Sequence, residues 1–593
     1  MKKKLLALIM VMVLAISLSA CSCSSSSSSS SESVKAFAQL DKAAWKYNSD
    51  DDVYYQIGLT YCEKAVDTDY ETLAIFVPGG YMNATDNGNG TFTCEINSDN
   101  KVGNYTAGNA PIVMPINTPG YSAMEALTSY SSYTDYTKEG LVYVHAGCRG
   151  RDAGAPAGVT DLKAAVRFLR YIDSNMPGSC DNIFTFGMSG GGAQSALMGA
   201  TGDSSLYEPY LTAIGAVSGV SDAVAGSMCW CPITNLDTAD EAYEWMMAST
   251  RSGLSEEEQT ISNELAKSFA TYINNAGIKD DNGGVLSLSE SSDGIYQAGT
   301  YYDYMKTVIE GSLNNFLSDT TFPYNASSSS SKGNGGGNRG GGAPGGREPS
   351  GEAPSGEGPS GRSKSSDTSS AEANDNITRN NTSSSLSLSG TYNTPQEYID
   401  ALNANGTWVT YDASTNKATI SDIKSFVGAF KSASKNLGAF DQLDASQGEN
   451  TLFGYGDGSG AHFDKYLAEI LTNMGSQYAS SYNSDLVKKD SVGNTVDVRV
   501  NMYNPLYYLL DGEQGKNTSK VAKFWRIRTG IAQSDCALST EMNLSLALKN
   551  YTGVESVDFE TVWGKGHTEA ERTGNSTDNF ITWVKTCTQN NAS

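Results

Sequence analysis

The sequence predicts an α/β fold in which a mostly parallel sheet carries helices on both faces and is interrupted by a mainly helical insertion. Short runs of β-branched and aromatic residues alternate with segments of helical periodicity through the first part of the chain. This alternation is typical of parallel sheets, because each crossover between parallel strands needs a long connection, usually a helix. After residue 236 the alternation stops, and sheet-like sequence returns only near the C-terminus.

The N-terminus has the pattern of an export signal. Lysines at positions 2–4 precede an apolar run over residues 5–18, and small residues lead to Cys21. Such a run is typical of a secretory signal and is short for a membrane span. The residues LSAC that end at Cys21 also resemble the lipobox of bacterial lipoproteins. We expect residues 1–20 to be removed and Cys21 to be lipidated, with an ordinary signal peptide as the alternative.

We therefore expect an extracytoplasmic protein that a lipid anchor attaches to the bacterial cell membrane. The serine-rich residues 21–34 would form a tether. The net charge of −25 argues against nucleic acid as a partner, because a phosphate-binding surface needs a positive balance. No metal-ligand spacing and no dinucleotide fingerprint is found, so we expect no metal and no cofactor. Disulfide pairing and oligomeric state stay open.

The first part of the sheet domain is expected over residues 35–236. Its strands are predicted at 53–60, 72–77, 111–116, 141–144, 182–186 and 213–217. A helix is predicted at 158–175, where apolar residues recur at helical spacing and Asp161 and Lys163 face outward. A second helix of small residues is predicted at 193–200.

A lid or cap insertion is expected over residues 237–515, between the sixth and seventh predicted strands. Its Ser-, Gly- and Pro-rich part, 326–389, cannot bury enough apolar area to offset its ordering entropy, so we expect it to be disordered. The sheet domain is completed by residues 516–593. Further elements are predicted as a helix at 394–403, a strand at 524–528, a helix at 540–550, a strand at 557–562 and a helix at 578–586.

Residues 187–191, Gly-Met-Ser-Gly-Gly, fit the G-x-S-x-G pattern of a nucleophile elbow. The pattern alone is weak in a chain so rich in glycine and serine, but a predicted strand enters it and a small-residue helix leaves it. The glycines are needed because the nucleophile occupies a strained turn in which side chains would clash. We therefore expect an α/β-hydrolase fold with Ser189 as nucleophile, and an ordinary glycine-rich turn is the alternative.

His567 is the expected general base. It follows the last predicted strand, as the order Ser, Asp, His of this fold requires. His145 ends a strand upstream of the nucleophile, and His462 lies inside the insertion as a lid contact or a surface residue. Arg149 and Arg151 either line the site entrance or form ion pairs within their loop.

Asp535 is the expected acid, because it is the one carboxylate in the loop after the penultimate strand. It would hold the imidazole tautomer and stabilise its positive charge; a turn or cap residue is the alternative. Gly190 is expected to supply one oxyanion-hole amide. The second is expected from Gly79 or Gly80, which follow an early strand and allow close approach of a backbone N–H.

Longer runs of the chain resemble bacterial tannases. They are residues 189–196, 199–202, 207–211, 231–236, 239–240 and 242–245. The resemblance covers the sheet domain and the ends of the insertion. It implies a serine esterase with an α/β-hydrolase core and a lid, which cleaves galloyl esters through an acyl-enzyme. It also places the family's triad on Ser189, Asp535 and His567.

The resemblance further implies a binding site for phenolic hydroxyls. Lys435 and Glu449 match the family's lysine and glutamate in type and spacing, and neighbouring hydroxyls need both donors and acceptors. A surface lysine and a loop glutamate are the alternative. The family's third phenol-binding residue is an aspartate very near the triad acid, but Ala537 stands two residues after Asp535. Either that contact is missing, or the register of this loop differs.

Other functions remain open at this stage. A general carboxylesterase or a feruloyl-type esterase would use the same scaffold. A serine peptidase is also compatible with Gly-x-Ser-x-Gly-Gly, although no propeller-like repeat is visible in the sequence. A non-catalytic lipoprotein that binds a ligand would not need Ser, Asp and His in this order.

Overall fold

The computed structural model describes residues 40–326 and 388–589. The expected signal peptide, tether and Cys21, all within residues 1–34, lie outside the described residues. The expected disordered segment 326–389 also lies outside them, except at its two ends.

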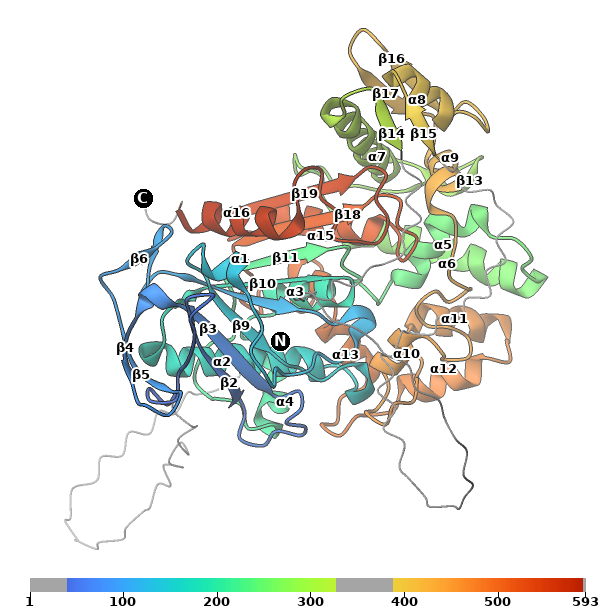
Figure 1. The fold of residues 1–593 in the computed structure, drawn as a ribbon. Coiled ribbons are helices and arrows are strands. Elements are labelled where there is room, and N and C mark those ends of the chain that lie inside the picture. The colour runs from blue at the N-terminus through green and yellow to red at the C-terminus, as the bar shows by residue number, and fades with distance from the viewer. Residues whose placement is uncertain (1–39, 327–387, 590–593) are drawn as a thin grey trace, which may run out of the picture. The chain divides into compact units, whose positions relative to one another are not determined.

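A nine-stranded mixed sheet lies at the centre of the described chain (Figure 1). Its order is β1-β2-β3-β9-β8-β10-β11-β18-β19, and the six strands from β9 to β19 run parallel. The first three strands pair antiparallel, and β3 is antiparallel to β9. The predicted α/β-hydrolase fold class is confirmed. The strands are β1 (Lys46–Asn48), β2 (Val53–Thr60), β3 (Thr72–Pro78), β8 (Pro111–Ile116), β9 (Val142–Ala146), β10 (Ser179–Met188), β11 (Gly226–Trp230), β18 (Phe524–Gly530) and β19 (Ser556–Val562).

Helices cover both faces of this sheet, as the alternation along β10 shows. Phe184 packs edge-on against Trp583 of α16, whereas the next residue, Thr185, hydrogen-bonds to Ser195 of α3 at 2.9 Å. Successive side chains of a strand point to opposite faces, so α16 and α3 lie on opposite sides. The helices of this part are α1 (Thr134–Thr137), α2 (Ala157–Ile172), α3 (Gly190–Ala200), α4 (Glu208–Ala213), α15 (Ser539–Lys549) and α16 (Ser576–Gln589).

A long insertion leaves the sheet between β11 and β18 (Figure 1). It follows the seventh strand of the sheet in chain order rather than the sixth, because the short strand β1 was not predicted. Its described part is mainly helical. The helices are α5 (Ala239–Met247), α6 (Glu256–Ala276), α7 (Thr300–Asp319), α8 (Pro395–Leu402), α9 (Ile423–Phe426), the π-helix η7 (Val427–Lys431), α10 (Gly448–Leu452), α11 (Lys465–Met474), α12 (Ala479–Leu486), α13 (Val496–Met502) and α14 (Pro505–Leu509).

The described part of the insertion also contains three two-stranded ribbons. They are β12 (Ser289–Ser291) with β13 (Gly294–Ala298), β14 (Tyr324–Ala326) with β15 (Gly390–Tyr392), and β16 (Val409–Asp412) with β17 (Lys417–Ile420). Outside the insertion, the smaller pairs are β4 (Met82–Asp86) with β5 (Phe92–Ile96) and β6 (Lys101–Val102) with β7 (Tyr105–Thr106). In the described ranges, no helix combines the length and the apolar character that crossing a membrane would require.

The insertion has a hydrophobic cluster of its own. Buried Ile261 and Leu265 of α6 pack with Leu467 and Leu471 of α11 and with Tyr482 of α12. The predicted domain boundaries and the role of the insertion as a lid stay predictions.

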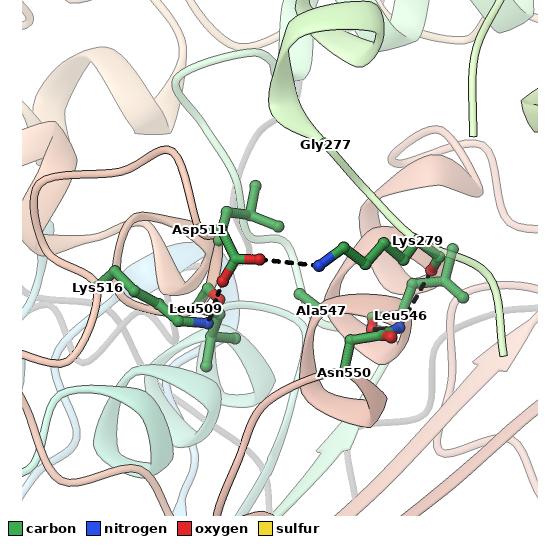
Figure 2. A pocket seen from close by; sticks show the side chains of 9 residues that line it. Gly277, Lys279, Leu509, Asp511, Lys516, Leu546, Ala547 and Asn550 are labelled. Atoms are coloured by element: carbon green, nitrogen blue, oxygen red, sulfur yellow. Dashed lines mark hydrogen bonds and ion pairs between the residues drawn. The ribbon is translucent and has the colours of Figure 1, made fainter. Parts of the chain in front are cut away.

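The far end of α15 is tied to two segments of the insertion (Figure 2). Asn550 donates from Nδ2 to the carbonyl oxygens of Lys279 and Asp280, at 3.2 Å each. Lys279 and Lys516 both pair with Asp511, at 2.9 and 3.3 Å. The Asn550 bonds tie the C-terminal end of α15 to the insertion.

Two predictions of local structure are wrong. Residues 213–217 form no strand; helix α4 ends at Ala213, and the neighbour of β10 is β11. A short apolar run does not distinguish a buried strand from a buried turn. Asp161 and Lys163 do not face outward: both are buried, and they pair with Arg149 at 2.6 Å and Asp222 at 2.8 Å. Helical periodicity does not reveal charges that are buried in pairs.

The close approach of backbones at the elbow gives a first testable prediction. A β-carbon on Gly191 would lie 2.0 Å from the carbonyl oxygen of Ile116, whereas one on Gly311 of α7 would meet nothing within 4 Å. We expect Gly191→Ala to lower the free energy of unfolding by about 1–3 kcal/mol. Gly311→Ala should leave it unchanged or raise it by up to about 1 kcal/mol. Denaturant unfolding of both variants measures the difference, and equal stability would contradict the packing described here.

Candidate active site

Ser189 occupies a strained turn at the carboxyl edge of the sheet. It follows β10 directly and has φ 59° and ψ −123°. Its N–H donates to the carbonyl of Trp230 at 2.9 Å, which ties the turn to the end of β11. Positive φ also occurs at Tyr121, after β8, and at Cys231 and Asn235, after β11. Strained non-glycine residues cluster at functional sites, and this edge is where open α/β sheets bind ligands.

The loop after β8 faces the elbow. A β-carbon on Gly190 would lie 2.5 Å from both the Thr118 carbonyl oxygen and the Tyr121 nitrogen, and 3.2 Å from the Gly120 nitrogen. The Tyr121 N–H donates to Thr118 at 2.9 Å, so the Gly120 N–H is the candidate partner of the Gly190 N–H in an oxyanion hole. Gly190 also begins helix α3, whose N-terminus favours negative charge.

The predicted oxyanion role of Gly79 and Gly80 is wrong. These residues follow β3, which is antiparallel to β9, so they lie at the edge of the sheet opposite to Ser189. A β-carbon on Gly79 would meet Asp52, and Asn100 donates to the Gly80 carbonyl at 2.9 Å. The prediction used the position of this strand in the chain but did not consider the direction in which it runs in the sheet.

His567 lies in the loop after β19, at the same edge as Ser189. Its neighbour Thr568 accepts a hydrogen bond from the Cys231 thiol at 3.2 Å. Cys231 directly follows Trp230, which binds the Ser189 backbone. The loops after β10, β11 and β19 are therefore connected through two adjacent residues.

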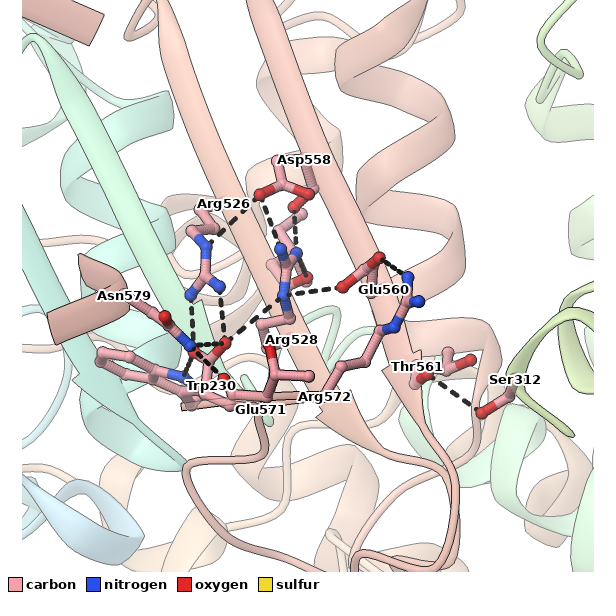
Figure 3. Close-up of polar contacts among 12 residues, drawn as sticks. Trp230, Ser312, Arg526, Arg528, Asp558, Glu560, Thr561, Glu571, Arg572 and Asn579 are labelled. Atoms are coloured by element: carbon pink, nitrogen blue, oxygen red, sulfur yellow. Dashed lines mark hydrogen bonds and ion pairs between the residues drawn. The ribbon is translucent and has the colours of Figure 1, made fainter. Parts of the chain in front are cut away.

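Ion pairs hold the His567 loop on the sheet (Figure 3). Glu571, four residues after His567, accepts two hydrogen bonds of 2.6 Å from Arg526 of β18. It also accepts from the Trp230 indole at 2.9 Å. Arg572 binds Glu560 of β19 at 2.6 Å. Because these partners come from three strands, the loop is fixed against the carboxyl half of the sheet.

The imidazole of His567 has two acceptors near Nδ1. Gln533 Oε1 lies at 2.8 Å and Asp535 Oδ2 at 3.7 Å, so the amide and not the carboxylate is within hydrogen-bond distance. Burial lowers the pKa of His567; Asp535 raises it, and the ammonium groups of Lys435 and Lys431 lower it further. The net pKa is below its ordinary value, so the imidazole is a neutral base at neutral pH.

Gln533 and Glu541 were missed as site residues. Gln533 Nε2 donates to Glu541 Oε1 at 2.5 Å and to Thr529 Oγ1 at 2.9 Å. Burial raises the pKa of Glu541 to about 7, although Lys431 lowers it. A glutamine does not look like the acid of a triad, and a glutamate within a predicted helix looks like a surface residue. No sequence signal therefore indicated either one.

Lys435 and Glu449 lie near each other and near Asp535. Burial lowers the pKa of Lys435, but the carboxylates of Glu449 and Asp535 raise it above its ordinary value, so the ammonium stays charged. The Lys435 nitrogen lies 3.9 Å from the centre of the Phe440 ring. Glu449, on α10, is 8% exposed. Burial, and to a lesser extent the Glu449 charge, raises the pKa of Tyr121, which places Glu449 beside the oxyanion loop.

A buried aspartate of the insertion fixes the segment between these two residues. Asp441 accepts hydrogen bonds from Asn450 Nδ2, beside Glu449, and from His462 Nδ1, each at 2.7 Å. The Tyr482 hydroxyl donates to the Asp441 carbonyl, also at 2.7 Å. His462 is thus a buried partner in this insertion and not a surface residue.

The two loop arginines have different roles. Arg149 is paired with Asp161 and is partly buried, as the ion-pair alternative predicts. Arg151 donates from Nη1 to the Gly120 carbonyl at 2.9 Å and lies against Gly448 of α10. It connects the oxyanion loop with the insertion.

Several other side chains are structural. His145 bonds through Nε2 to the Glu125 carbonyl at 2.8 Å. In the described ranges, no group of three His, Cys, Asp or Glu side chains is arranged to hold a metal ion. The described cysteines are all free and buried, namely Cys62, Cys94, Cys148, Cys180, Cys229, Cys231, Cys536 and Cys587.

Bacterial tannases are among the solved structures similar to this fold. The Fusobacterium nucleatum tannase is 25% identical, with a TM-score of 0.64 over 90% of this chain and 95% of its own. The Lactobacillus plantarum tannin acyl hydrolase is 23% identical, with a TM-score of 0.62 over 91% of this chain and 94% of its own. A tannin acyl hydrolase in complex with 3,4-dihydroxybenzoate is 25% identical, with a TM-score of 0.61 over 90% of this chain and 94% of its own. No family model and no curated protein matches the chain.

The chain is a structural relative of the bacterial tannases. The resemblance predicted from the sequence is confirmed. The likeness extends beyond the sheet domain, since it covers nine-tenths of this chain. In this tannase-like fold, Ser189 and His567 lie on connected loops at one edge, and Lys435 and Glu449 come from the insertion.

Two variants test whether the loop of Gly120 or the loop of Gly80 supplies an oxyanion donor. Each changes a side chain that binds a glycine carbonyl of one loop. Arg151 binds Gly120 and Asn100 binds Gly80, both at 2.9 Å. We expect Arg151→Met to lower kcat by roughly 10- to 100-fold, because a small displacement of an oxyanion donor is costly. Asn100→Leu should leave kcat within about twofold, because its loop lies at the opposite edge of the sheet. Steady-state hydrolysis of a phenyl ester compares them, and the reverse order of effects would restore the role of Gly80.

Proposed function

We propose that this protein is a serine esterase that hydrolyses galloyl or related phenolic esters through an acyl-enzyme intermediate. The chain is a carboxylic ester hydrolase, the class of its tannase neighbours; the proposal concerns its mechanism and its substrate. It rests above all on the strained Ser189, which faces the Gly120 loop and adjoins the loop of His567.

The mechanism follows from these positions. Ser189 Oγ attacks the ester carbonyl while His567 Nε2 takes its proton. The N–H groups of Gly190 and Gly120 stabilise the oxyanion of the tetrahedral intermediate. The imidazolium then gives its proton to the leaving alcohol, and the acyl group stays on Ser189. Water, deprotonated by His567, releases the acid and restores the serine.

The substrate class is inferred from Lys435 and Glu449. A charged ammonium donates hydrogen bonds and a buried carboxylate accepts them, which suits adjacent phenolic hydroxyls. A site built to bind hydroxyls rejects an analogue without them, because its buried polar groups are then left unpaired. Solved tannin acyl hydrolases hold 3,4-dihydroxybenzoate and ethyl gallate, and we propose the same ligand class for this chain.

Substrate preference tests this proposal. We expect wild-type protein to hydrolyse methyl gallate with a kcat/KM at least about 100-fold above that for methyl benzoate. Lys435→Met and Glu449→Gln should each remove most of this preference while leaving methyl benzoate hydrolysis nearly unchanged. Lys424→Met, a change at an exposed lysine of α9, is the matched control and should have no effect.

Each possible outcome of this experiment has a separate meaning. Equal rates on both esters in wild type would indicate a general carboxylesterase. Full activity of Ser189→Ala on methyl gallate would contradict the serine mechanism itself. A fluorophosphonate probe that fails to label wild type would favour a non-catalytic ligand-binding protein.

We also propose that the protein is exported and anchored through lipid on Cys21, outside the cell and on the membrane. The proposal rests on the LSAC sequence that ends at Cys21 and the serine-rich residues that follow.

Membrane fractionation after labelling with radioactive palmitate tests the anchor. We expect label on wild-type protein and none on Cys21→Ser, with the variant released from the membrane fraction. Cys23→Ser is the matched control, because this cysteine lies two residues beyond Cys21. Palmitate on the Cys21→Ser protein would contradict the anchor.

A further inference from the structure

We propose that Gln533, held in place by Glu541, orients His567 in the position where a serine triad usually has a carboxylate. This inference rests on the proposed serine mechanism and extends it. Gln533 Oε1 lies 2.8 Å from His567 Nδ1, whereas Asp535 Oδ2 lies at 3.7 Å. Gln533 is 2% exposed, while the Asp535 side chain is 47% exposed. An orienting group needs a fixed, buried position, and Gln533 has one.

The orientation of the Gln533 amide determines the imidazole tautomer. An amide oxygen accepts a hydrogen bond, so it places the proton on Nδ1 and leaves the Nε2 lone pair for Ser189. A flipped amide would donate to Nδ1 and place the proton on Nε2, where it would block the base. The amide nitrogen donates to Glu541, Thr529 and Cys536, at 2.5, 2.9 and 3.3 Å. These acceptors hold the oxygen toward the imidazole.

Glu541 also supplies charge. A neutral amide cannot stabilise the imidazolium that forms when Ser189 attacks, as a triad carboxylate does. The Glu541 carboxylate lies directly behind the amide, and its Oε2 is buried without a hydrogen-bond partner in the described part of the chain. Its negative charge can therefore act on His567 through one polarised amide.

The ionisation of Glu541 responds to groups on three surrounding segments. Lys431 of η7 lowers the pKa of Glu541, and its ammonium donates to the Gln533 carbonyl. Cys536 comes from the loop after β18 and Cys231 from the loop after β11; burial raises the pKa of both thiols, so they stay uncharged near neutral pH. Burial leaves the pKa of Glu541 at about 7. Glu541 therefore becomes negatively charged as the pH rises through about 7.

Placing Gln533 in the orienting position also accounts for the position of Asp535 in the loop after β18. The family's phenol-binding aspartate lies very near the triad acid, and Ala537 does not provide it if Asp535 is that acid. With Gln533 in the orienting position, Asp535 follows it by two residues. The charge of Asp535 raises the pKa of Lys435, so Asp535 lies near Lys435, while its Oδ2 stays beyond hydrogen-bond distance of His567 Nδ1.

The rate of Ser189 phosphonylation by a fluorophosphonate, followed from about pH 5 to pH 9, tests the assignment. This reaction needs the base but no phenolic substrate, so a wrong ester class does not affect it. We expect Gln533→Ala to slow labelling by about 10³- to 10⁴-fold, as loss of the correct tautomer does. Asp535→Asn should slow it by at most about tenfold, because this change removes a charge that raises the pKa of His567 but no hydrogen bond to the imidazole.

Two further variants separate an orienting role from a structural one. Glu541→Gln keeps a hydrogen-bond acceptor but cannot ionise. The labelling rate of wild type should rise through about pH 7. In Glu541→Gln that rise should be absent, with a loss of roughly tenfold at pH 8. The double variant Gln533→Glu with Glu541→Gln exchanges the carboxylate and the amide. It should label at least as fast as wild type, without the rise near pH 7.

The outcomes exclude one another. A loss of about 10⁴-fold in Asp535→Asn, with Gln533→Ala near wild type, would overturn the assignment and make Asp535 the acid. Slow labelling of both Gln533→Ala and the double variant, at a thermal stability equal to that of wild type, would also overturn it. Normal labelling without methyl gallate hydrolysis would contradict only the proposed substrate.

Discussion

The backbone contact among three strand ends is the constraint on which this structure depends. Beta-carbons on Gly187 and Gly191 would lie 2.5 and 2.0 Å from the Ile116 carbonyl oxygen, and one on Gly192 would lie 2.8 Å from the Trp230 carbonyl. Glycine alone permits such an approach. Because β8, β10 and β11 meet this closely, they hold the turn between β10 and α3, where Ser189 has positive φ.

A second constraint is electrostatic. The charged groups around His567 alternate in sign: Lys431 and Glu541 lie behind Gln533, and Lys435 lies with Glu449 and Asp535. Burial of any one of these charges alone would be costly, since an unpaired buried ion loses its hydration. Nearby charges of opposite sign offset part of this cost around His567, whose pKa is lowered by burial. The insertion supplies both lysines and Glu449, so the charges around His567 depend on it.

Much of this architecture could be predicted from the sequence. The strand and helix around 182–200 were recognisable because the glycine pattern, the apolar run and the small-residue helix agree with one another. His567 followed from chain order. Strand direction could not be read in this way, and Gly79 and Gly80 were therefore assigned to the wrong edge of the sheet. The buried charges Asp161 and Lys163 were placed outside, because their partners are distant in sequence.

Gln533, which we propose as the orienting residue, was missed for a different reason. Gln533 and Asp535 are two residues apart in an irregular loop, and only the three-dimensional path of that loop shows which one approaches His567. A search for a carboxylate selects Asp535 regardless of geometry. Lys435 and Glu449 were found through the resemblance to tannases, since their spacing alone carries no physical signal.

The burial of the described cysteines affects when their thiols can be oxidised. Each is a buried free thiol, and burial raises the pKa of all eight, for example to about 11 at Cys94 and Cys231. Exchange with oxidants proceeds through the thiolate, which is scarce in such surroundings. The eight described thiols should therefore exchange slowly once the chain has folded, and they are most open to oxidation in the interval between synthesis and burial.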